Sequence, residues 1–189
     1  VVKANALEDP DLVEELYRAS MAGVDIDLVV RDICRLRPGI EGLSETVDVY
    51  SIVDRFLEHS RIFYFENGGD PEYYIGSADW MTRNLDKRVE AVTPVTDPDV
   101  REQLRFVLEL CLRDNRSAWT MNPDGTYDQR TPCEDEPTVC TQDVLMACTR
   151  AAHETGDDRG IVPEHPAIET TLLLEGSAPD PSDDHTPAE

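Results

Sequence analysis

Apolar residues in the first two thirds of the chain repeat with two periods, one typical of helices and one typical of strands. Residues 9–23 start with an aspartate followed by a proline, end at a glycine, and space Leu12, Leu16 and Ala19 for one buried face. This arrangement is typical of a capped amphipathic helix. Residues 97–115 begin with the same Asp-Pro pair and are also amphipathic, so we expect a second capped helix there.

Runs of β-branched and aromatic residues predict strands around these helices. Residues 24–31 alternate and then become continuously apolar, as a strand does when it enters the middle of a covered sheet. Four more strands are expected, at 47–52, 61–66, 72–77 and 88–95. Helices and strands that alternate in this way predict an α/β fold, with helices on the faces of a sheet.

Two of these strands are joined by a strong turn signal, the sequence Asn-Gly-Gly-Asp at 67–70. It predicts a hairpin whose turn needs positive φ angles. A turn centred on the two glycines makes His59 face Ser77 and Asp79. Arg61 lies on the same face as His59, because residues two apart in a strand point the same way. We expect these four polar side chains to converge.

Charge, aromatic content and proline content divide the chain near residue 121. Residues 1–121 hold 24 acids, 14 bases and 11 of the 12 aromatic residues, whereas residues 122–189 hold 16 acids, 3 bases and 8 of the 13 prolines. We therefore expect one domain at 1–121 and an acidic, proline-rich, largely irregular tail at 122–189. The tail lacks the apolar residues that a core requires.

One segment of the tail carries a helical pattern. Residues 141–154 have Thr141 at the N-cap position and an apolar face of Val144, Leu145 and Cys148. We expect one helix there, and disorder in the final stretch EGSAPDPSDDHTPAE.

The net charge of −23 argues against a protein that binds nucleic acid through a basic surface. The basic residues are two lysines and fifteen arginines. An acid-rich, lysine-poor surface suits a high-salt cytoplasm, because at about 1 M salt the Debye length falls to about 3 Å and repulsion between carboxylates is screened. The alternative is an acidic surface that only aids solubility, and the sequence leaves both open.

The cysteines and the first residues of the chain indicate where the protein is expected in the cell. Five cysteines, none of them in a CxxC, favour reduced thiols in the cytoplasm. Cys133, Cys140, Cys148 and His153 lack the short spacings of zinc sites, so no metal ligand is predicted. The chain has no basic leader and no apolar run near 18 residues, so we expect neither a signal peptide nor a membrane span. Since it opens without an initiator methionine, we expect a piece of a larger protein.

Three arginines follow the apolar strand at 24–31. Arg31 ends the strand, and Arg35 and Arg37 lie in the loop after it. Reactive groups gather at strand ends in α/β sheets, and guanidinium groups bind phosphate through a planar fork. An anion-binding site is therefore one interpretation. The other is that Arg35 and Arg37 are solvated or paired with acids of this chain.

The segment around the hairpin carries a recognisable motif. It consists of His59-x-Arg61, four residues, Glu66, nine residues, and then Gly76-Ser77-x-Asp79. This resembles the phospholipase D superfamily signature, which is histidine-x-lysine, four residues, aspartate, six residues, and Gly-Gly or Gly-Ser followed by asparagine. The charged positions are changed, and the spacer is three residues longer.

Longer blocks resemble one family more specifically. VVKANALEDP, VVRDICRLRPGIEGLSE and the stretch from SIVDRFLEHS to RVEAVTPV are similar to the carboxy-terminal catalytic domain of polyphosphate kinase, over about residues 1–120. The resemblance implies a phospholipase D-like domain, with a mixed sheet flanked by helices. It also implies a second such domain across the active site, an amino-terminal region and a head domain elsewhere in the protein.

The resemblance further implies a reaction and its residues. The family transfers the γ-phosphate of ATP to inorganic polyphosphate through a phosphohistidine that lies outside this chain. His59 matches a second histidine that binds ATP and assists transfer, a task that suits imidazole near neutral pH. Arg31 matches a nucleotide-binding arginine. Phosphate contacts or support for His59 are expected from Arg61, Ser77, Asp79 and Arg83, and Asp79 is a candidate to orient the imidazole.

The sequence also leads to expectations about ligands, partner domains and alternative functions. The resemblance implies ATP, ADP, Mg²⁺ and polyphosphate, and the remaining domains of the same enzyme. We also expect a homo-oligomer. We expect residues 1–189 alone to be inactive. Two other function classes remain open, a phospholipase D-like phosphodiesterase and a non-catalytic domain that binds polyanions.

Overall fold

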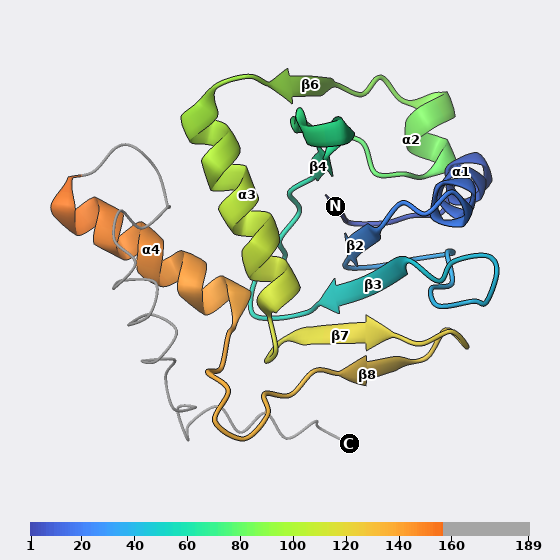
Figure 1. The fold of residues 1–189 in the computed structure, drawn as a ribbon. Helices are drawn as coiled ribbons and strands as arrows, with labels where there is room; N and C mark the ends of the chain where they lie inside the picture. The colour runs from blue at the N-terminus through green and yellow to red at the C-terminus, as the bar shows by residue number, and fades with distance from the viewer. Residues whose placement is uncertain (157–189) are drawn as a thin grey trace, which may run out of the picture.

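The computed structural model describes residues 1–156, and Figure 1 shows their fold. Eight strands form one sheet in the order β6-β5-β4-β1-β2-β3-β7-β8. They are β1 Val2–Ala4, β2 Ile26–Val30, β3 Val47–Ile52, β4 Ile62–Phe65, β5 Glu72–Gly76, β6 Val92–Val95, β7 Ala118–Met121 and β8 Tyr127–Gln129. Strands β1, β2 and β3 are parallel to one another, and every other pairing in the sheet is antiparallel. The predicted mixed α/β sheet is therefore confirmed.

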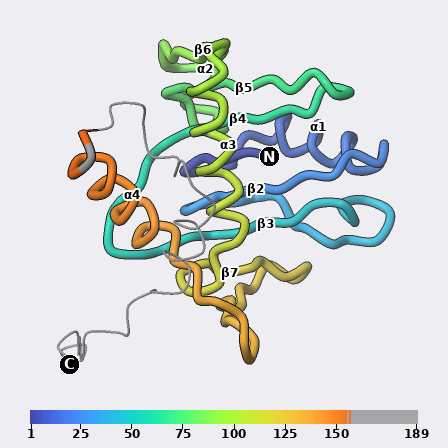
Figure 2. The backbone as a smooth tube through the Cα atoms, turned by 60° about the vertical axis from the view of Figure 1, so that its left-hand side comes forward, coloured from blue at the N-terminus to red at the C-terminus, as the bar shows by residue number. Residues whose placement is uncertain are grey.

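Four α-helices surround this sheet, α1 Pro10–Met21, α2 Thr82–Lys87, α3 Pro98–Arg113 and α4 Thr141–Thr155. Helix α1 packs its apolar residues against Leu28 and Val30 of β2. Val29 points to the opposite face, where it lines a small cavity with Val107 and Cys111 of α3. Figure 2 shows α3 crossing the strands from the β6 side of the sheet to the β7 side. Helices thus cover both faces.

Helices α1 and α3 begin at the caps that the sequence predicts. The Asp9 side chain caps α1 by accepting hydrogen bonds of 3.1 Å from two backbone amides, and Asp97 caps α3 in the same way. Proline follows each cap, where its missing N–H costs no helical hydrogen bond. Gly23, with φ of +87°, follows α1 and lets the chain turn back into β2.

The hairpin has the predicted register but a longer connection. Ile62 pairs with Ile75 and Phe65 with Glu72, and the same register extended places residue 59 opposite 78. Residues 66–71 connect the strands through a short 3₁₀ helix, η1 Asn67–Gly69, rather than a tight turn. All three residues of η1 have positive φ, as the Asn-Gly-Gly sequence predicts.

Several elements are absent from the sequence predictions. The sequence patterns indicate neither β1, which has three residues, nor α2, β7 and β8, and β6 covers only the second half of the predicted strand at 88–95. Very short segments provide too few residues for a period to stand out. Strand β1 is nevertheless central, because it joins the parallel strands to the β4–β5 hairpin.

Residues beyond 121 contribute to the folded body. Strand β8 pairs with β7 in the same sheet. Helix α4 packs against α3, where Val139, Val144 and Cys148 form a buried cluster with Phe106 and Leu110. The expectation that this part lacks core residues is therefore wrong for 122–156, because the apolar face of α3 supplies the other half of the cluster. A domain boundary at 121 stays a prediction.

Helix α4 confirms the predicted helix with a different cap. Thr141 is its first residue, and Cys140 occupies the N-cap position without a side-chain hydrogen bond. The amide of Thr141 instead donates to the buried carboxylate of Asp114, at 2.8 Å. Gly156 ends the helix in the left-handed conformation. The predicted disordered stretch lies outside the described residues.

Within residues 1–156, every helix is too short or too polar to cross a lipid bilayer.

Candidate functional site

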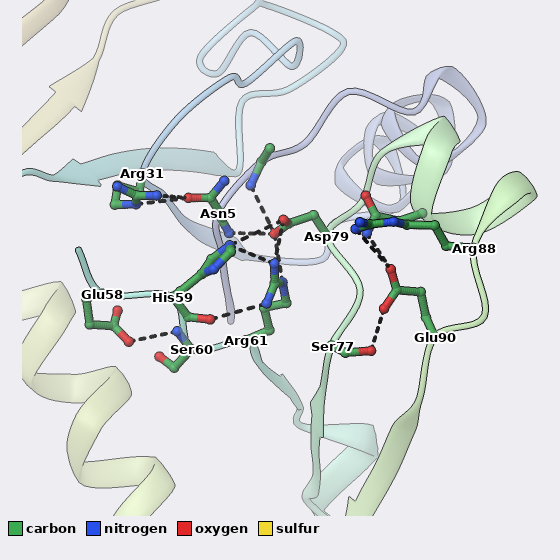
Figure 3. A network of polar contacts seen from close by, with 12 residues as sticks. Asn5, Arg31, Glu58, His59, Ser60, Arg61, Ser77, Asp79, Arg88 and Glu90 are labelled. Atoms are coloured by element: carbon green, nitrogen blue, oxygen red, sulfur yellow. Dashed lines mark hydrogen bonds and ion pairs between the residues drawn. The ribbon is translucent and has the colours of Figure 1, made fainter.

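Two of the predicted site residues, Arg31 and His59, lie with Asn5 where the parallel strands end. Asn5 follows β1, Arg31 follows β2, and His59 lies in the loop of residues 53–61 between β3 and β4. Because β4 pairs with the far side of β1, this loop crosses the carboxyl ends of β1 and β2. Ligands bind at this edge of α/β sheets. Figure 3 shows the side chains that meet there.

Asp79 is the centre of the polar network in Figure 3, and only 2% of it is exposed. Its Oδ1 accepts hydrogen bonds from the amides of Asn5 and Ala6, at 2.8 and 3.3 Å, and from Arg61 Nε at 3.0 Å. Its Oδ2 accepts from Arg61 Nη2 at 2.7 Å. Burial by itself raises the pKa of Asp79, but Arg61 and the two amides outweigh it and hold that pKa below its usual value. Asp79 is therefore a fixed negative charge at neutral pH.

His59 contacts Arg61 rather than Asp79. The distance from Arg61 Nη2 to His59 Nε2 is 2.7 Å, and Arg61 Nη1 donates to the His59 carbonyl at 3.3 Å. A guanidinium only donates, so Nε2 accepts and the imidazole proton is assigned to Nδ1. Asp79 Oδ2 is 3.8 Å from Nε2, which is too long for a hydrogen bond. The expected orientation of the imidazole by Asp79 is therefore indirect, through Arg61.

Arg31 joins the same network through Asn5. Its Nε donates to Asn5 Oδ1 at 2.9 Å, and its Nη2 donates to the same oxygen. The backbone N–H of Asn5 donates to Asp79. Asn5 therefore connects Arg31, through its side chain, with the group of Asp79, Arg61 and His59. Arg31 is half-buried and also lines a cavity of about 650 Å³ beside Ser51 at the end of β3.

Ser77 lies outside this group, so the predicted convergence of four side chains is wrong for one of them. Its hydroxyl donates to Glu90 at 2.5 Å and accepts from the Ala91 amide at 3.1 Å. Glu90 also accepts from Asn84, at 2.6 Å. Ser77 is drawn to the β6 side because the chain before β6 brings a carboxylate within reach. Arg83 is exposed on α2, and no hydrogen bond or ion pair joins its side chain to another residue of the described part of the chain.

Of the other two arginines of the predicted anion site, Arg37 lines the same cavity as Arg31, whereas Arg35 does not. Arg35 Nη1 lies 3.1 Å from a carboxylate oxygen of Glu8. Arg37 Nε donates to the backbone carbonyl of Pro123 at 2.7 Å. The interpretation in which these arginines pair with acids of the chain therefore holds for Arg35, whereas Arg37 contacts a backbone carbonyl beside the cavity of Arg31.

Asn5, Lys3 and Glu58 are site residues that sequence reasoning missed. Lys3 forms a mostly buried ion pair with Glu58, the residue before His59. The contacts of Lys3 with Glu58 and of Asn5 with Asp79 join residues more than 50 positions apart. The contact of Asn5 with Arg31 spans 26 positions. No local pattern marks such pairs, although all three residues fall within the blocks that carry the family resemblance.

Metal ligands are not grouped in the part of the chain that the structure describes. Among residues 1–156, no group of three or more histidine, cysteine, aspartate or glutamate side chains could hold a metal ion. All five cysteines are free thiols. The site next to His59 is built from two arginines and a carboxylate, and Arg61 and two backbone amides already engage that carboxylate.

Comparison with known proteins identifies the family. A model described as polyphosphate kinase C-terminal domain 2 matches residues 1–142. The polyphosphate kinase of Thermosynechococcus vestitus is 58% identical over 149 residues, which are 79% of this chain and 20% of that protein. The enzyme of Synechocystis is 54% identical over 158 residues, 84% of this chain and 21% of the relative.

A solved structure agrees with these matches. The crystal structure of polyphosphate kinase from Porphyromonas gingivalis superposes with a TM-score of 0.76 at 42% identity, covering 82% of this chain and 24% of that one. The chain thus spans about a fifth of the length of the curated relatives. The family match extends past residue 120, through β7, β8 and the start of α4, which accords with their place in the sheet and its covering helices. The chain therefore belongs to the polyphosphate kinase C-terminal domain 2 family.

Proposed function

We propose that this chain is part of an enzyme that transfers the γ-phosphate of ATP to the end of an inorganic polyphosphate chain, reversibly. Membership of the family supports the reaction class. The phosphohistidine intermediate is expected on another domain of the same protein, so these residues form one wall of the active site. The single observation that carries the proposal is the network from Arg31 through Asn5 and Asp79 to Arg61 and His59.

The network has the properties that phosphoryl transfer requires. Catalysis of this reaction depends mainly on positioning and on stabilising the charge of the transferring oxygens. Asp79 neutralises one of the two arginines and fixes its orientation, and Asn5 orients the other. The result is a rigid cationic edge at the carboxyl ends of β1 and β2.

His59 has one nitrogen engaged and one available. Because Nε2 accepts from Arg61, Nδ1–H is the group that can donate to a phosphoryl oxygen. The His59 side chain is half exposed, with 54% of its surface accessible. We propose that it donates a hydrogen bond to the transferring group and stabilises the charge that develops there.

The remaining candidates divide into supporting and contacting residues. Arg31 uses Nε and Nη2 for Asn5 and keeps Nη1 for a nucleotide phosphate. Arg61 and Asp79 support His59, and Ser77 supports the chain near Glu90. Arg83 has an exposed guanidinium and is proposed as an outer phosphate contact.

Mg²⁺ is proposed to enter with ATP as part of the substrate. The described residues do not fit a metal site, since Asp79 is engaged by Arg61 and two amides and no other acidic cluster lies beside His59. Magnesium keeps several waters and binds phosphate oxygens readily, so it needs few protein ligands. No step of the proposal passes through a metal held by this chain.

Location and assembly are also proposals. We propose that the enzyme works in the cytoplasm, which the five free thiols support. The other domains of the same protein are its proposed partners, with assembly into a homo-oligomer.

The decisive experiment uses the whole enzyme and measures transfer of label from γ-labelled ATP into polyphosphate. We expect His59→Ala to lose synthesis by about a hundredfold or more, as is typical when a hydrogen-bond donor to the transition state is removed, while the fold is retained. His153→Ala is the matched control, because this exposed histidine lies on α4. Residues 1–189 alone are expected to make no polyphosphate. Equal activity of the His59→Ala enzyme and wild type would contradict the proposed role.

A further inference from the structure

The loop that carries His59 has little apolar anchorage of its own. Of residues 53–61, the apolar side chains of Val53, Phe56 and Leu57 are exposed by 62%, 51% and 85%. Burial of these side chains therefore contributes little to the position of the loop. Something else must hold the backbone that leads to His59.

Gln142 of α4 binds the backbone of this loop at two points. The amide of Phe56 donates to Gln142 Oε1 at 2.8 Å, and Gln142 Nε2 donates to the carbonyl of Phe56 at 2.9 Å. One side-chain amide thus satisfies both backbone groups of a residue, as a neighbouring strand would. Gln142 is buried, with 7% of its surface exposed, so these bonds are shielded from water.

The start of α4, from which Gln142 extends, is itself fixed by buried hydrogen bonds. Thr141, next to Gln142, donates from its amide to Asp114, which is fully buried at the end of α3. The other oxygen of that carboxylate accepts from three successive amides of residues 116–118. Asn115 and Val139 exchange hydrogen bonds of 2.8 and 3.0 Å. Gln142 therefore projects from a rigid junction between α3 and α4.

A second contact lies directly before His59, at Glu58. Glu58 pairs with Lys3 of β1 and also accepts from the Ser60 amide at 2.8 Å. The loop is thus held at residue 56 through its backbone, by Gln142, and at residue 58 through its side chain, by Lys3. His59 follows directly after these two fixed points and then meets Arg61.

We propose that Gln142 is a positioning residue for His59. It acts at a distance, by holding the backbone of Phe56 so that the His59 imidazole stays against Arg61 and faces the transferring phosphate. This inference rests on the proposed function for its effect on the reaction. It makes α4, which lies in the acidic second part of the chain, a support for the active site.

The test uses the whole enzyme with Gln142→Met, which keeps the buried volume and removes both hydrogen bonds to Phe56. We expect amide hydrogen exchange in peptides covering 53–61 to become about ten- to a hundredfold faster, because two backbone bonds are lost. The kcat for polyphosphate synthesis is expected to fall about tenfold or more, with KM for ATP changed less than about twofold. Gln142→Glu, which keeps an acceptor for the Phe56 amide, is expected to lie between wild type and Gln142→Met.

Two comparisons separate positioning from general destabilisation. In a His59→Ala background, Gln142→Met is expected to change the residual kcat by less than about twofold, because the group that it positions is gone. Gln129→Met is the matched control, since Gln129 also donates to a backbone carbonyl, that of Arg116, but far from His59. It should leave both readouts unchanged.

Each other outcome has a definite meaning. An equal fall in kcat with and without His59, or unchanged exchange in 53–61, overturns the inference. A whole enzyme that makes no polyphosphate would instead refute the proposed function, and exchange in 53–61 would still decide whether Gln142 holds the loop.

Discussion

Arg61 and Asp79 form a bidentate ion pair, with Nε 3.0 Å from Oδ1 and Nη2 2.7 Å from Oδ2. The Arg61 side chain is 12% exposed and that of Asp79 is 3% exposed. The pair joins the start of β4 to the loop after β5, and two further amides from the loop after β1 bind the same carboxylate. It therefore connects three segments of the site.

Asp79→Asn is expected to destabilise the fold around the site by about 3–5 kcal/mol, the usual cost of leaving one member of a buried ion pair without its partner. Arg61 would keep its charge and lose its counter-ion. Thermal unfolding of the whole enzyme at neutral pH measures the change. Asp124→Asn is a suitable control because Asp124 accepts only from neighbouring Thr126 at the surface. Equal melting temperatures for Asp79→Asn and wild type would contradict the prediction.

The lowered pKa of Asp79 also predicts a direction of pH dependence. A carboxyl group whose pKa is lower in the folded state stabilises that state at any pH above its unfolded pKa, about 3.9 for aspartate. This contribution is lost as the pH falls from there through the lowered folded value. Between neutral pH and about pH 3, the melting temperature should therefore fall more steeply for wild type than for Asp79→Asn. If the melting temperatures of both proteins fell equally with pH, the titration of Asp79 would not contribute to the pH dependence of stability.

Arg31→Ala is expected to lower kcat/KM for ATP by about ten- to a hundredfold, the effect of losing one or two charge-assisted hydrogen bonds to phosphate. Arg35→Ala provides a close control, because Arg35 lies in the same loop but pairs with Glu8. Initial rates of polyphosphate synthesis at varied ATP measure both. If the two variants lost the same activity, the assignment of Arg31 would be wrong.

Gly76→Ala is expected to destabilise the hairpin by about 1–3 kcal/mol through overpacking. A Cβ at this position would lie 2.9 Å from the Ala91 carbonyl oxygen and 3.0 Å from a methyl carbon of Val92. The edge strand β6 would have to move, along with the bond between Ser77 and the Ala91 amide. Gly68→Asn is the control, because Gly68 has open space and a φ of +65° that asparagine tolerates. Differential scanning calorimetry of both variants measures whether only Gly76→Ala lowers the stability.

Molar KCl is expected to raise the melting temperature relative to dilute buffer. The chain carries 40 acids against 17 bases, and screening at about 1 M salt shortens the range of their repulsion to about 3 Å. A variant with exposed Glu45, Asp70 and Asp86 changed to amides should depend less on salt. A melting temperature that stays constant or falls in KCl would favour the alternative, an acidic surface that aids only solubility.

The sequence by itself determined the features that local physics fixes. Caps and a 3.6-residue period placed α1 and α3, because a helix is decided by neighbours three and four positions apart. The Asn-Gly-Gly turn and strand alternation set the register that brings His59 opposite residue 78. The family resemblance then identified His59 and Arg31 as candidates, and the comparisons confirm the family.

Tertiary structure alone decided how these residues are held. Asn5 meets Asp79 across 74 positions, Gln142 meets Phe56 across 86, and Ser77 turns toward Glu90 instead of His59. Such contacts depend on strand order, since the central place of β1 between β2 and β4 brings Asn5 between Arg31 and Asp79. The apolar face of α3 likewise gave α4 a surface to cover, although the composition after residue 121 indicated a tail. A local period carries no information about which distant partner will complete a hydrogen bond or a core.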